Sequence, residues 1–304
     1  LMVLESFDAL KKQLSSTKST PKRVVVAKAS DEHTLGAVLS LCEEGLLFPI
    51  LVGEKERIIA LLRKMEVPEK MIERLQIIDV AGDTEIAEKA VSVIKEGLGD
   101  VLMKGHIQTR DLLKAVVNKE TGIRESKALS HVAINEIPYY HKLLFLTDGG
   151  MMLTPDVDTK EDILLNALSL TKKLGYVHTN VAVLDASENV NPKLQASTDA
   201  VILKERFEAN DFGDVTVEGP ISLDLSLSKE IAKEKDYESP VAGEADILLV
   251  PDIVAGNLLG KSMVTFGKGK MAGLVLGAKV PIIITSRGST TEEKMNSLMI
   301  ACAM

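Results

Sequence analysis

The feature that most constrains the fold is an alternation of short β-branched runs with longer amphipathic segments along the first 120 or so residues. Strands are expected at 23–27, 48–52, 75–80 and 100–104, and helices at 31–44, 54–65, 84–96 and 109–118. Ser30 is expected to cap the first of these helices. This strand–helix rhythm predicts an α/β fold with a largely parallel sheet and helices on both faces.

The second half begins with two strand-like runs, 128–134 and 142–147, that have no long helix between them. A cluster of turn residues at 148–156 follows and is the best candidate for a domain crossing. Beyond it, strands are expected at 181–184, 215–217, 247–250, 273–276 and 281–285, and helices at 160–174, 191–206, 253–265 and 290–303. The charge-rich stretch 222–238 is expected to be a surface helix or loop. The pattern favours two lobes that meet at a cleft.

Composition limits the kinds of partner. The chain has 304 residues, 45% hydrophobic and 26% charged, which is an ordinary globular balance. A net charge of −8 argues against nucleic acid as the main ligand. No apolar run reaches the roughly 20 residues needed to span a bilayer. Cys42 and Cys302 fit buried free thiols in a reducing compartment, and with the five histidines they make no metal-binding pattern. A cytoplasmic, metal-independent protein is expected.

The turn at residues 285–293 follows an apolar strand and opens the last expected helix. Free amides at a helix N-terminus suit an anion, and the planar fork of Arg287 suits a phosphate. Ser286 can hydrogen-bond a carbonyl or a developing oxyanion. A structural interpretation fits as well, because Thr290 and Glu293 have the spacing of a capping box in which Glu293 only satisfies a free amide. The pattern leaves both interpretations open.

A second polar turn, residues 103–110, also lies between an expected strand and an expected helix. Lys104, His106, Thr109 and Arg110 make this turn polar and cationic, with helix amides behind it, which suits phosphate binding. The alternative is an ordinary helix start, with Thr109 as the N-cap and Arg110 in solvent. Spacing does not separate the two.

Three other segments are read mainly as structural. Asp148 is expected to hold a domain hinge through an Asx turn. Asp252 is expected to cap the following helix, in which Gly256 and Asn257 are poor helix formers, so a ligand or another backbone segment is expected to approach closely there. The glycine-rich run 267–273 precedes a strand instead of following one, so it does not predict a dinucleotide site.

Taken together, several segments resemble the phosphate acetyl/butyryltransferase family. The resemblance is carried by 250–257 (VPDIVAGN), 284–288 (ITSRG), 103–109, 129–134, 146–148 and 218–224, which fall in the family's order. It covers roughly residues 20 to 304. The segments 130–134 and 218–224 look more like the butyryl branch than the acetyl branch.

The resemblance implies a two-lobed fold similar to isocitrate and isopropylmalate dehydrogenases. Lobe I would comprise residues 1–147 with 280–304, lobe II residues 148–279, and the active site would lie in the interlobe cleft of a homodimer. The implied reaction moves a short acyl group, butyryl or similar, directly between coenzyme A and inorganic phosphate in a ternary complex. The implied partners are acyl-CoA, inorganic phosphate and acyl phosphate; the CoA thioester is a substrate, and no cofactor is implied.

The resemblance also implies residue roles. Ser286 and Arg287 match the family's serine and arginine, and Glu293 falls at its acidic residue, which is an aspartate in the acetyl branch and is proposed to take the proton of the CoA thiol. Cations expected to replace further arginines of the acetyl branch are Lys104, Arg110, Lys114 and Lys127. The implied substrate-binding positions are Lys104, Gly105, His106, Thr109, Arg110, Ser130, Asn257 and Gly288.

Alternative functions remain. One is a phosphate acetyltransferase acting on acetyl-CoA. A second is an NAD-dependent decarboxylating dehydrogenase of the same fold, but the aspartate cluster and arginines that it needs are not evident in the sequence. A third is a non-catalytic protein that binds CoA or acyl phosphate; such a protein is expected to lose Ser286, Arg287 or Glu293, and all three are present.

Overall fold

The computed structural model describes residues 3–286 and 288–304, and these form two compact units. Residues 10–127 and 272–304 make up the first, called here the outer unit because it takes both flanks of the sequence. The second, the middle unit, contains residues 3–9 and 128–271. Each unit has its own sheet segment and its own helices, and each is described by itself.

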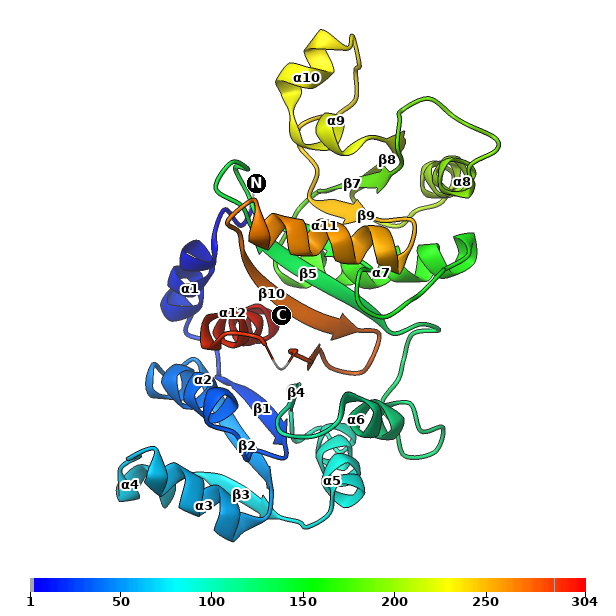
Figure 1. Ribbon diagram of the computed structural model, residues 1–304. Coiled ribbons are helices and arrows are strands. Elements are labelled where there is room, and N and C mark those ends of the chain that lie inside the picture. Colours follow the sequence, from blue (N-terminus) through cyan, green and yellow to red (C-terminus); the bar gives the residue numbers. More distant parts are fainter. Residues whose placement is uncertain (1–2, 287) are drawn as a thin grey trace. The chain divides into compact units, whose positions relative to one another are not determined.

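The outer unit is built on six strands, all but β11 labelled in Figure 1. They are β1 (Lys22–Ala27), β2 (Leu47–Gly53), β3 (Gln76–Asp79), β4 (Val101–Lys104), β10 (Lys270–Leu276) and β11 (Ile282–Ile283), in the order β3-β2-β1-β4-β11-β10. All neighbours in this order pair in parallel except β10 and β11, which are antiparallel. The prediction of a mostly parallel α/β sheet is confirmed.

Helices pack on this sheet and bury its central strand. They are α2 (Glu32–Glu43), α3 (Lys55–Lys64), α4 (Glu69–Ile72), α5 (Asp83–Lys95), α6 (Thr109–Val116) and α12 (Thr291–Ala303); α1 (Phe7–Ser16) runs across the boundary between the units in sequence. Helix α2 packs beside α12, and α5 beside α6. Residues Val24–Ala27 of β1 are all 0% exposed, so both faces of this strand are covered.

The strand order of the outer unit creates one reversal. From β1 the chain moves to β2 and β3 on one side, and it then returns to place β4 on the other side of β1. In open α/β sheets, ligands bind outside the carboxyl ends of the strands at such a reversal. The place to look for a site in this unit is therefore the pair of turns after β1 and β4.

The middle unit has a five-stranded segment in the order β5-β6-β9-β7-β8. Its elements are β5 (Ser130–Glu136), β6 (Leu144–Thr147), β7 (Thr179–Leu184), β8 (Val215–Ile221) and β9 (Ile247–Leu249), with α7 (Val157–Lys173), α8 (Gln195–Ala209), α9 (Leu223–Leu227), α10 (Lys229–Glu234) and α11 (Ile253–Thr265). Only β5 and β6 are antiparallel among the pairs of this segment. The same rule places a strand-order reversal between β7 and β9.

Each strand and helix expected from the sequence is present, with its ends shifted by a few residues. The stretch 222–238 contains α9 and α10. The expected cap of α2 was wrong: Asp31 is the N-cap instead of Ser30, and its Oδ1 accepts a hydrogen bond from the Thr34 amide at 2.8 Å. A carboxylate placed three residues before a first-turn amide satisfies that amide, whereas Ser30 lies one residue too early.

The two units divide the chain at other positions than the predicted lobes. Residues 128–147, assigned to lobe I from the sequence, lie in the middle unit, because β6 pairs with β5 and β9. Most of β10, assigned to lobe II, lies in the outer unit because it pairs with β11. The interlobe cleft stays a prediction.

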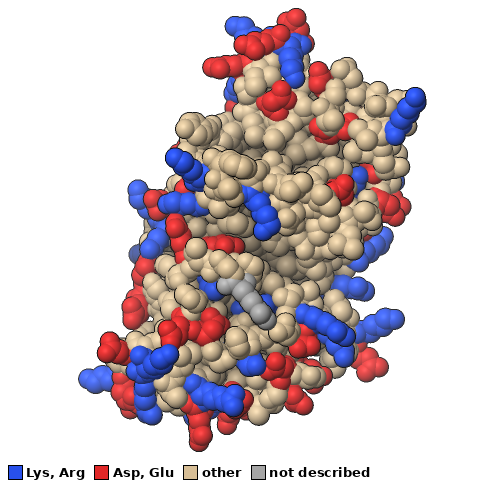
Figure 2. Space-filling model, in the orientation of Figure 1, with Lys and Arg blue, Asp and Glu red and all other residues tan. Residues whose placement is uncertain are grey.

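The surface carries charges of both signs. On the face that Figure 2 shows, acidic and basic side chains are interspersed and do not form a broad basic patch. None of the helices formed by residues 3–286 and 288–304 is both long and apolar enough to cross a membrane.

Candidate functional site

A polar cavity of about 410 Å³ lies at the carboxyl ends of β1, β4 and β11 in the outer unit. Its walls come from the turns after these strands, at 28–34, 104–109 and 285–289, together with Asp83 and Lys294. This is the strand-order reversal between β1 and β4. The location that the topology predicts for a ligand therefore holds a cavity lined by polar side chains.

The floor of the cavity depends on a close contact between two backbones. The Gly105 amide donates to the Ala27 carbonyl at 2.9 Å, and the His106 amide donates to the Lys28 carbonyl at 2.8 Å. A Cβ atom on Gly105 would lie 2.2 Å from the Lys28 oxygen. Glycine is required here because any side chain would push the turn after β4 away from the end of β1.

Lys28 itself has a φ of 61°, which is unusual for a residue with a side chain. The conformation lets its carbonyl accept the amides of Ser30 and His106 at 2.8 Å each. Its ammonium forms an ion pair of 2.7 Å with Asp83 at the start of α5. The left-handed residue thus joins the end of β1 to the turn after β4, and its side chain stays at the cavity wall.

Helix α6 begins at the cavity without a capping side chain. Its N-cap residue is Gln108, and no side-chain hydrogen bond caps the helix. The predicted alternative role of Thr109 as N-cap is therefore wrong: Thr109 is the first helical residue. First-turn amides without a side-chain acceptor are suited to bind an anion.

The cavity is rich in cationic side chains. Three ammonium groups line it, those of Lys28, Lys104 and Lys294, against the carboxylates of Asp31 and Asp83. Asp83 pairs with Lys28, and Asp31 caps α2. The arrangement favours a small anion with several oxygens, since ammonium groups and helix amides both donate to oxygen.

Two side chains of the predicted site, those of Ser286 and Glu293, lie on either side of Ser289 in the turn before α12 and its first helical turn. The hydroxyls of Ser286 and Ser289 lie 3.1 Å apart, and Ser289 also hydrogen-bonds the Glu293 carboxylate. Burial raises the pKa of Glu293, while the Ser289 hydrogen bond and the charge of Lys294 oppose that rise. The Glu293 amide donates a hydrogen bond of 3.1 Å to Thr290 Oγ1, so the threonine half of the capping box is present.

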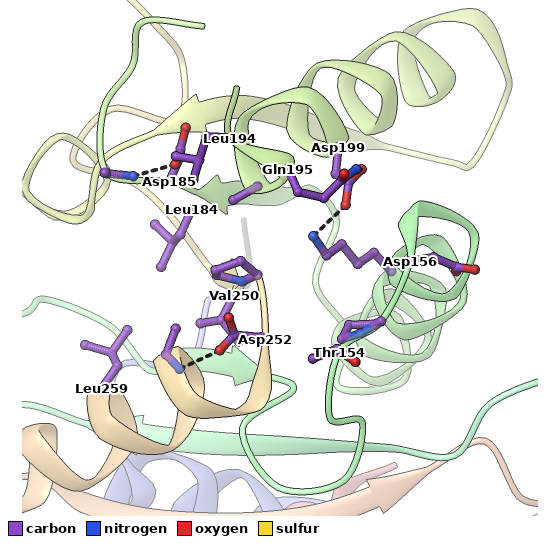
Figure 3. A pocket seen from close by; sticks show the side chains of 16 residues that line it. Thr154, Asp156, Leu184, Asp185, Leu194, Gln195, Asp199, Val250, Asp252 and Leu259 are labelled. Atoms are coloured by element: carbon purple, nitrogen blue, oxygen red, sulfur yellow. Dashed lines mark hydrogen bonds and ion pairs between the residues drawn. The ribbon is translucent and has the colours of Figure 1, made fainter. Parts of the chain in front are cut away.

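A larger cavity of about 810 Å³ lies in the middle unit, at the reversal between β7 and β9 (Figure 3). Its walls are mostly apolar, with Leu184, Leu194, Val250 and Leu259 among them. At its side, Lys160 and Asp199 form an ion pair of 2.8 Å in which both side chains are almost fully buried.

The polar groups of this larger cavity are satisfied by protein partners. Asp156 accepts from the Thr159 amide and Asp252 from the Ala255 amide, so both carboxylates cap helices. With Asp185 and Asp199 there are four carboxylates against one ammonium. Such walls repel phosphate and suit an uncharged ligand. Although it is smaller, the polar cavity of the outer unit is therefore the candidate phosphate site.

The chain is similar to known proteins along nearly its whole length. A profile of the family described as "Phosphate acetyl/butaryl transferase" matches residues 83–302. A phosphate acetyltransferase of Thermotoga maritima is 36% identical over 96% of this chain and 98% of its own length. A phosphate butyryltransferase of Clostridium acetobutylicum is 34% identical over 98% of both chains.

This chain belongs to the phosphate acetyl/butaryl transferase family. A solved structure agrees: that of a branched-chain phosphotransacylase from Enterococcus faecalis V583 superposes with a TM-score of 0.82 at 35% identity, covering 93% of this chain and 98% of that one. The resemblance identified from sequence segments is thus confirmed over nearly the whole length.

The structure brings together five of the residues that the family resemblance pointed to. Lys104, Gly105, His106, Thr109 and Ser286 all line the polar cavity. They come from two turns that are separated by about 180 residues in sequence. Placing them in one cavity depends on the pairing of β4 with β11, which are parallel neighbours.

The remaining family positions lie elsewhere. Arg287 lies outside the described residues. Gly288 is exposed in the same turn, and Arg110 is exposed on the first turn of α6 beyond the cavity lining. Asn257 is exposed on α11 of the middle unit.

Ser130 is placed in the protein interior. It is 0% exposed on β5, and its hydroxyl accepts a hydrogen bond of 2.9 Å from Asn166. The same Asn166 amide group reaches the Ala128 carbonyl at 2.9 Å. The hydroxyl thus ties β5 to α7, and the expected substrate contact of Ser130 stays a prediction.

Sequence reasoning missed six residues of the cavity wall. They are Lys28, Asp31, His33, Thr34, Asp83 and Lys294. The first four follow β1, and the rule that was applied to the turns after β4 and β11 would have found them. Lys294 gives no such signal, because its direction depends on how α12 packs.

For Asp148, the expected Asx turn is present, but the domain hinge that was expected with it is not found at this position. The Asp148 carboxylate accepts the amides of Gly150 and Met151 at 2.8 Å each, and those of His131 and Met152 at 3.1 Å. It closes an Asx-type turn, as expected. This turn lies inside the middle unit and does not mark a unit boundary.

The early glycine of α11 also has the expected explanation. Asp252 caps the helix through the Ala255 amide at 2.9 Å. A Cβ atom on Gly256 would lie 2.6 Å from the Gly149 Cα atom. The close approach of the backbone at Gly149 therefore explains why a glycine stands at position 256.

Proposed function

We propose that this chain catalyses butyryl-CoA + phosphate to butyryl phosphate + CoA, in both directions, by direct transfer in a ternary complex. Family membership supports transfer of an acyl group between CoA and phosphate. The observation that carries the proposal is the cationic cavity at the β1/β4 reversal, which holds Ser286 beside the turn 104–109.

The butyryl preference is the finer part of the proposal. It is supported by the segments 130–134 and 218–224, which look like the butyryl branch. Relatives of similar identity carry both activities in their names, so the acyl chain has to be measured. One methylene in an apolar pocket changes binding by only about 1–3 kcal/mol, which makes the order of preference a matter of pocket shape.

In the proposed site, phosphate occupies the polar cavity. Arg287, Lys104 and the amides of residues 107–110 hold its oxygens, since the amides of Gly105 and His106 already donate to backbone carbonyls. The side chains of His106 and Thr109 add polar contacts. The acyl carbonyl lies near Ser286. The rate comes from holding the two substrates in position and from electrostatic stabilisation, with no covalent intermediate.

In the forward direction, a phosphate oxygen attacks the thioester carbonyl carbon and a C–O bond forms. The carbonyl oxygen takes the electron pair of its π bond and is stabilised by the Ser286 hydroxyl. The oxyanion then collapses, the C–S bond breaks, and the thiolate leaves with the bonding electrons and takes up a proton from the protonated Glu293. In the reverse direction, the Glu293 carboxylate takes the thiol proton and the thiolate attacks the carbonyl carbon of the acyl phosphate. The C–O bond to the phosphorus-bound oxygen then breaks, and inorganic phosphate leaves with its electrons.

The environment of Glu293 supports the base role. A thiol has a pKa near 8.5, and a base is more effective when its own pKa lies closer to the working pH. Burial raises the pKa of Glu293 above the ordinary range of a glutamate. We also propose that the protein has two lobes with a cleft, forms a homodimer and needs no cofactor.

The first test measures phosphate-dependent release of free CoA thiol from acetyl-, butyryl-, isobutyryl- and isovaleryl-CoA, with and without EDTA. The expected result is turnover that needs phosphate, survives EDTA and is fastest for butyryl-CoA by kcat/KM. Fastest turnover of acetyl-CoA would favour the acetyltransferase alternative. Binding of CoA by folded protein without release from any thioester would favour the non-catalytic alternative.

A further inference from the structure

Three lysines of the described chain are buried, and one of them differs from the other two. Lys142 is 5% exposed and pairs with Asp246 at 2.8 Å, and Lys160 is 3% exposed and pairs with Asp199 at 2.8 Å. Lys294 is 7% exposed, but no salt bridge joins it to a carboxylate within residues 3–286 and 288–304.

Within the described residues, the ammonium of Lys294 uses one of its N–H donors. It donates one hydrogen bond, of 2.8 Å, to the hydroxyl of Thr285 at the end of β11. An ammonium carries three N–H donors, and a neutral hydroxyl does not balance its charge. Removing a charge from water is costly unless an opposite charge compensates it, so the position calls for an anion.

The side that is open to an anion is the polar cavity. Lys294 lines this cavity from the first turn of α12, next to Ser286 and Ser289. The charge of Lys28 in the same wall is already balanced by Asp83. A small anion in the cavity would supply the charge that the other two buried lysines receive from aspartates.

We propose that Lys294 binds an oxygen of the phosphate that is transferred, either as inorganic phosphate or as the phosphoryl end of the acyl phosphate. This inference rests on the proposed function and names the residue that determines recognition of its phosphate substrate. Thr285 orients the ammonium through one donor, and the remaining donors face the anion. Lys294 is a binding residue, and neither of the two proton-transfer steps involves it.

The test replaces Lys294 by Met in the full chain, which keeps the length of the side chain and removes its charge. Loss of one charge-assisted hydrogen bond is expected to raise the KM for inorganic phosphate about 10- to 100-fold. The KM for butyryl-CoA is expected to change less than about threefold. If Lys294→Met does not fold, Lys294→Gln keeps a donor for Thr285 without the charge, and its phosphate KM decides in the same way.

Two matched variants separate binding from structure. Thr285→Val removes the hydrogen bond that orients the ammonium and leaves its charge, so its phosphate KM is expected to rise, but by less than that of Lys294→Met. Lys89→Met removes an exposed ammonium from α5, away from the cavity lining, and is expected to change neither KM. A lysine that only supports the fold would instead make Lys294→Met and Thr285→Val alike, with lower thermal stability and no selective change of the phosphate KM.

Other outcomes also overturn the proposal. An unchanged phosphate KM in Lys294→Met would exclude the contact. A rise in the KM for butyryl-CoA alone would mean that the ammonium binds the phosphates of CoA. Absence of turnover in the wild type would instead contradict the proposed function. In that case the increase in melting temperature produced by inorganic phosphate, present in the wild type and lost in Lys294→Met, still tests the role of Lys294 separately.

Discussion

The serine pair before α12 gives two side chains of the proposed site a physical connection. Ser286 and Ser289 are 3.1 Å apart, and Ser289 hydrogen-bonds Glu293. When Ser289 donates its proton to the carboxylate, its oxygen is left to accept the Ser286 proton. Binding of a substrate carbonyl then needs only a rotation of the Ser286 hydroxyl.

Replacement of Ser286 by Ala tests the oxyanion role. An oxyanion donor that is lost costs about 10²–10³-fold in kcat, and the KM values are expected to change little. The measurement is steady-state turnover of butyryl-CoA with saturating phosphate. Since Ser286 is exposed, the melting temperature of the Ser286→Ala variant is expected to match that of the wild type. Near-normal turnover by the folded variant would remove Ser286 from the mechanism.

The pH dependence tests the environment of Glu293. Its pKa is raised by burial and lowered in part by the Ser289 hydrogen bond. In the direction from acyl phosphate and CoA, the carboxylate must be deprotonated, so the rate falls as pH drops through this pKa. Ser289→Ala removes the lowering contribution, and the acidic limb of kcat/KM is expected to move to higher pH.

Glu293→Gln is the companion measurement, because it is expected to remove the acidic limb and most of the rate. An acidic limb that stays in place in Ser289→Ala and persists in Glu293→Gln would assign the titration to another group. A Glu293 that only caps α12 would leave kcat unaffected and lower the melting temperature instead.

Among the elements, the junction of β1 and β4 depends on a missing side chain. A Cβ atom at position 105 would lie 2.2 Å from the Lys28 carbonyl oxygen and 2.8 Å from that of Ala27. Both neighbours are backbone atoms at the carboxyl end of β1, which pairs with β4, so they cannot move aside independently of that strand.

Gly105→Ala is therefore expected to destabilise the protein by about 1–3 kcal/mol, the usual cost of overpacking, and to weaken phosphate binding as the turn shifts. Urea unfolding and the phosphate KM measure the two effects. Gly36→Ala is the control: it lies within α2 with nothing within 4 Å of the added atom, and alanine in a helix is expected to stabilise by about 0.5–1 kcal/mol. Equal stability of the two variants would contradict the packing argument.

At the scale of the whole molecule, the charge around the two cavities is compared with the net charge of the chain. The chain has a net charge of −8, yet the polar cavity is lined by three ammonium groups and two carboxylates. The middle unit reverses this, with four carboxylates around its larger cavity. Local charge at the strand ends, and not the net charge, therefore determines where a phosphate can bind.

The buried ion pair of the middle unit is expected to be important for stability. Lys160→Met leaves the Asp199 carboxylate, 1% exposed, without its cation. Removing one partner of a buried pair typically costs about 3–5 kcal/mol. Denaturant unfolding of Lys160→Met is expected to show a loss of this size.

The double variant Lys160→Met, Asp199→Leu removes both charges and is expected to recover much of the lost stability. A single variant as stable as the wild type would show that Asp199 gains enough from the Gln195 hydrogen bond of 2.6 Å to stand alone.

The amino-acid sequence by itself determined the elements and the turns that carry the chemistry. Strand–helix alternation, apolar strand runs and helix starts are local patterns, and each of them was found within a few residues of its place. Asp252 as a cap was also predicted correctly, because capping depends on a few neighbouring residues. For Gly256 the sequence left open a ligand or a backbone contact, and the structure shows the backbone contact. The family segments belong to this local category as well.

Only the tertiary structure decided which turns meet. The order β3-β2-β1-β4-β11-β10 joins the ends of β1, β4 and β11, and strand order follows from long-range packing that no local pattern records. For the same reason Ser130, which lies in a family segment, is buried against Asn166. Lys294, part of an ordinary helix start in sequence, faces the cavity without a carboxylate partner in the described chain because α12 packs beside α2.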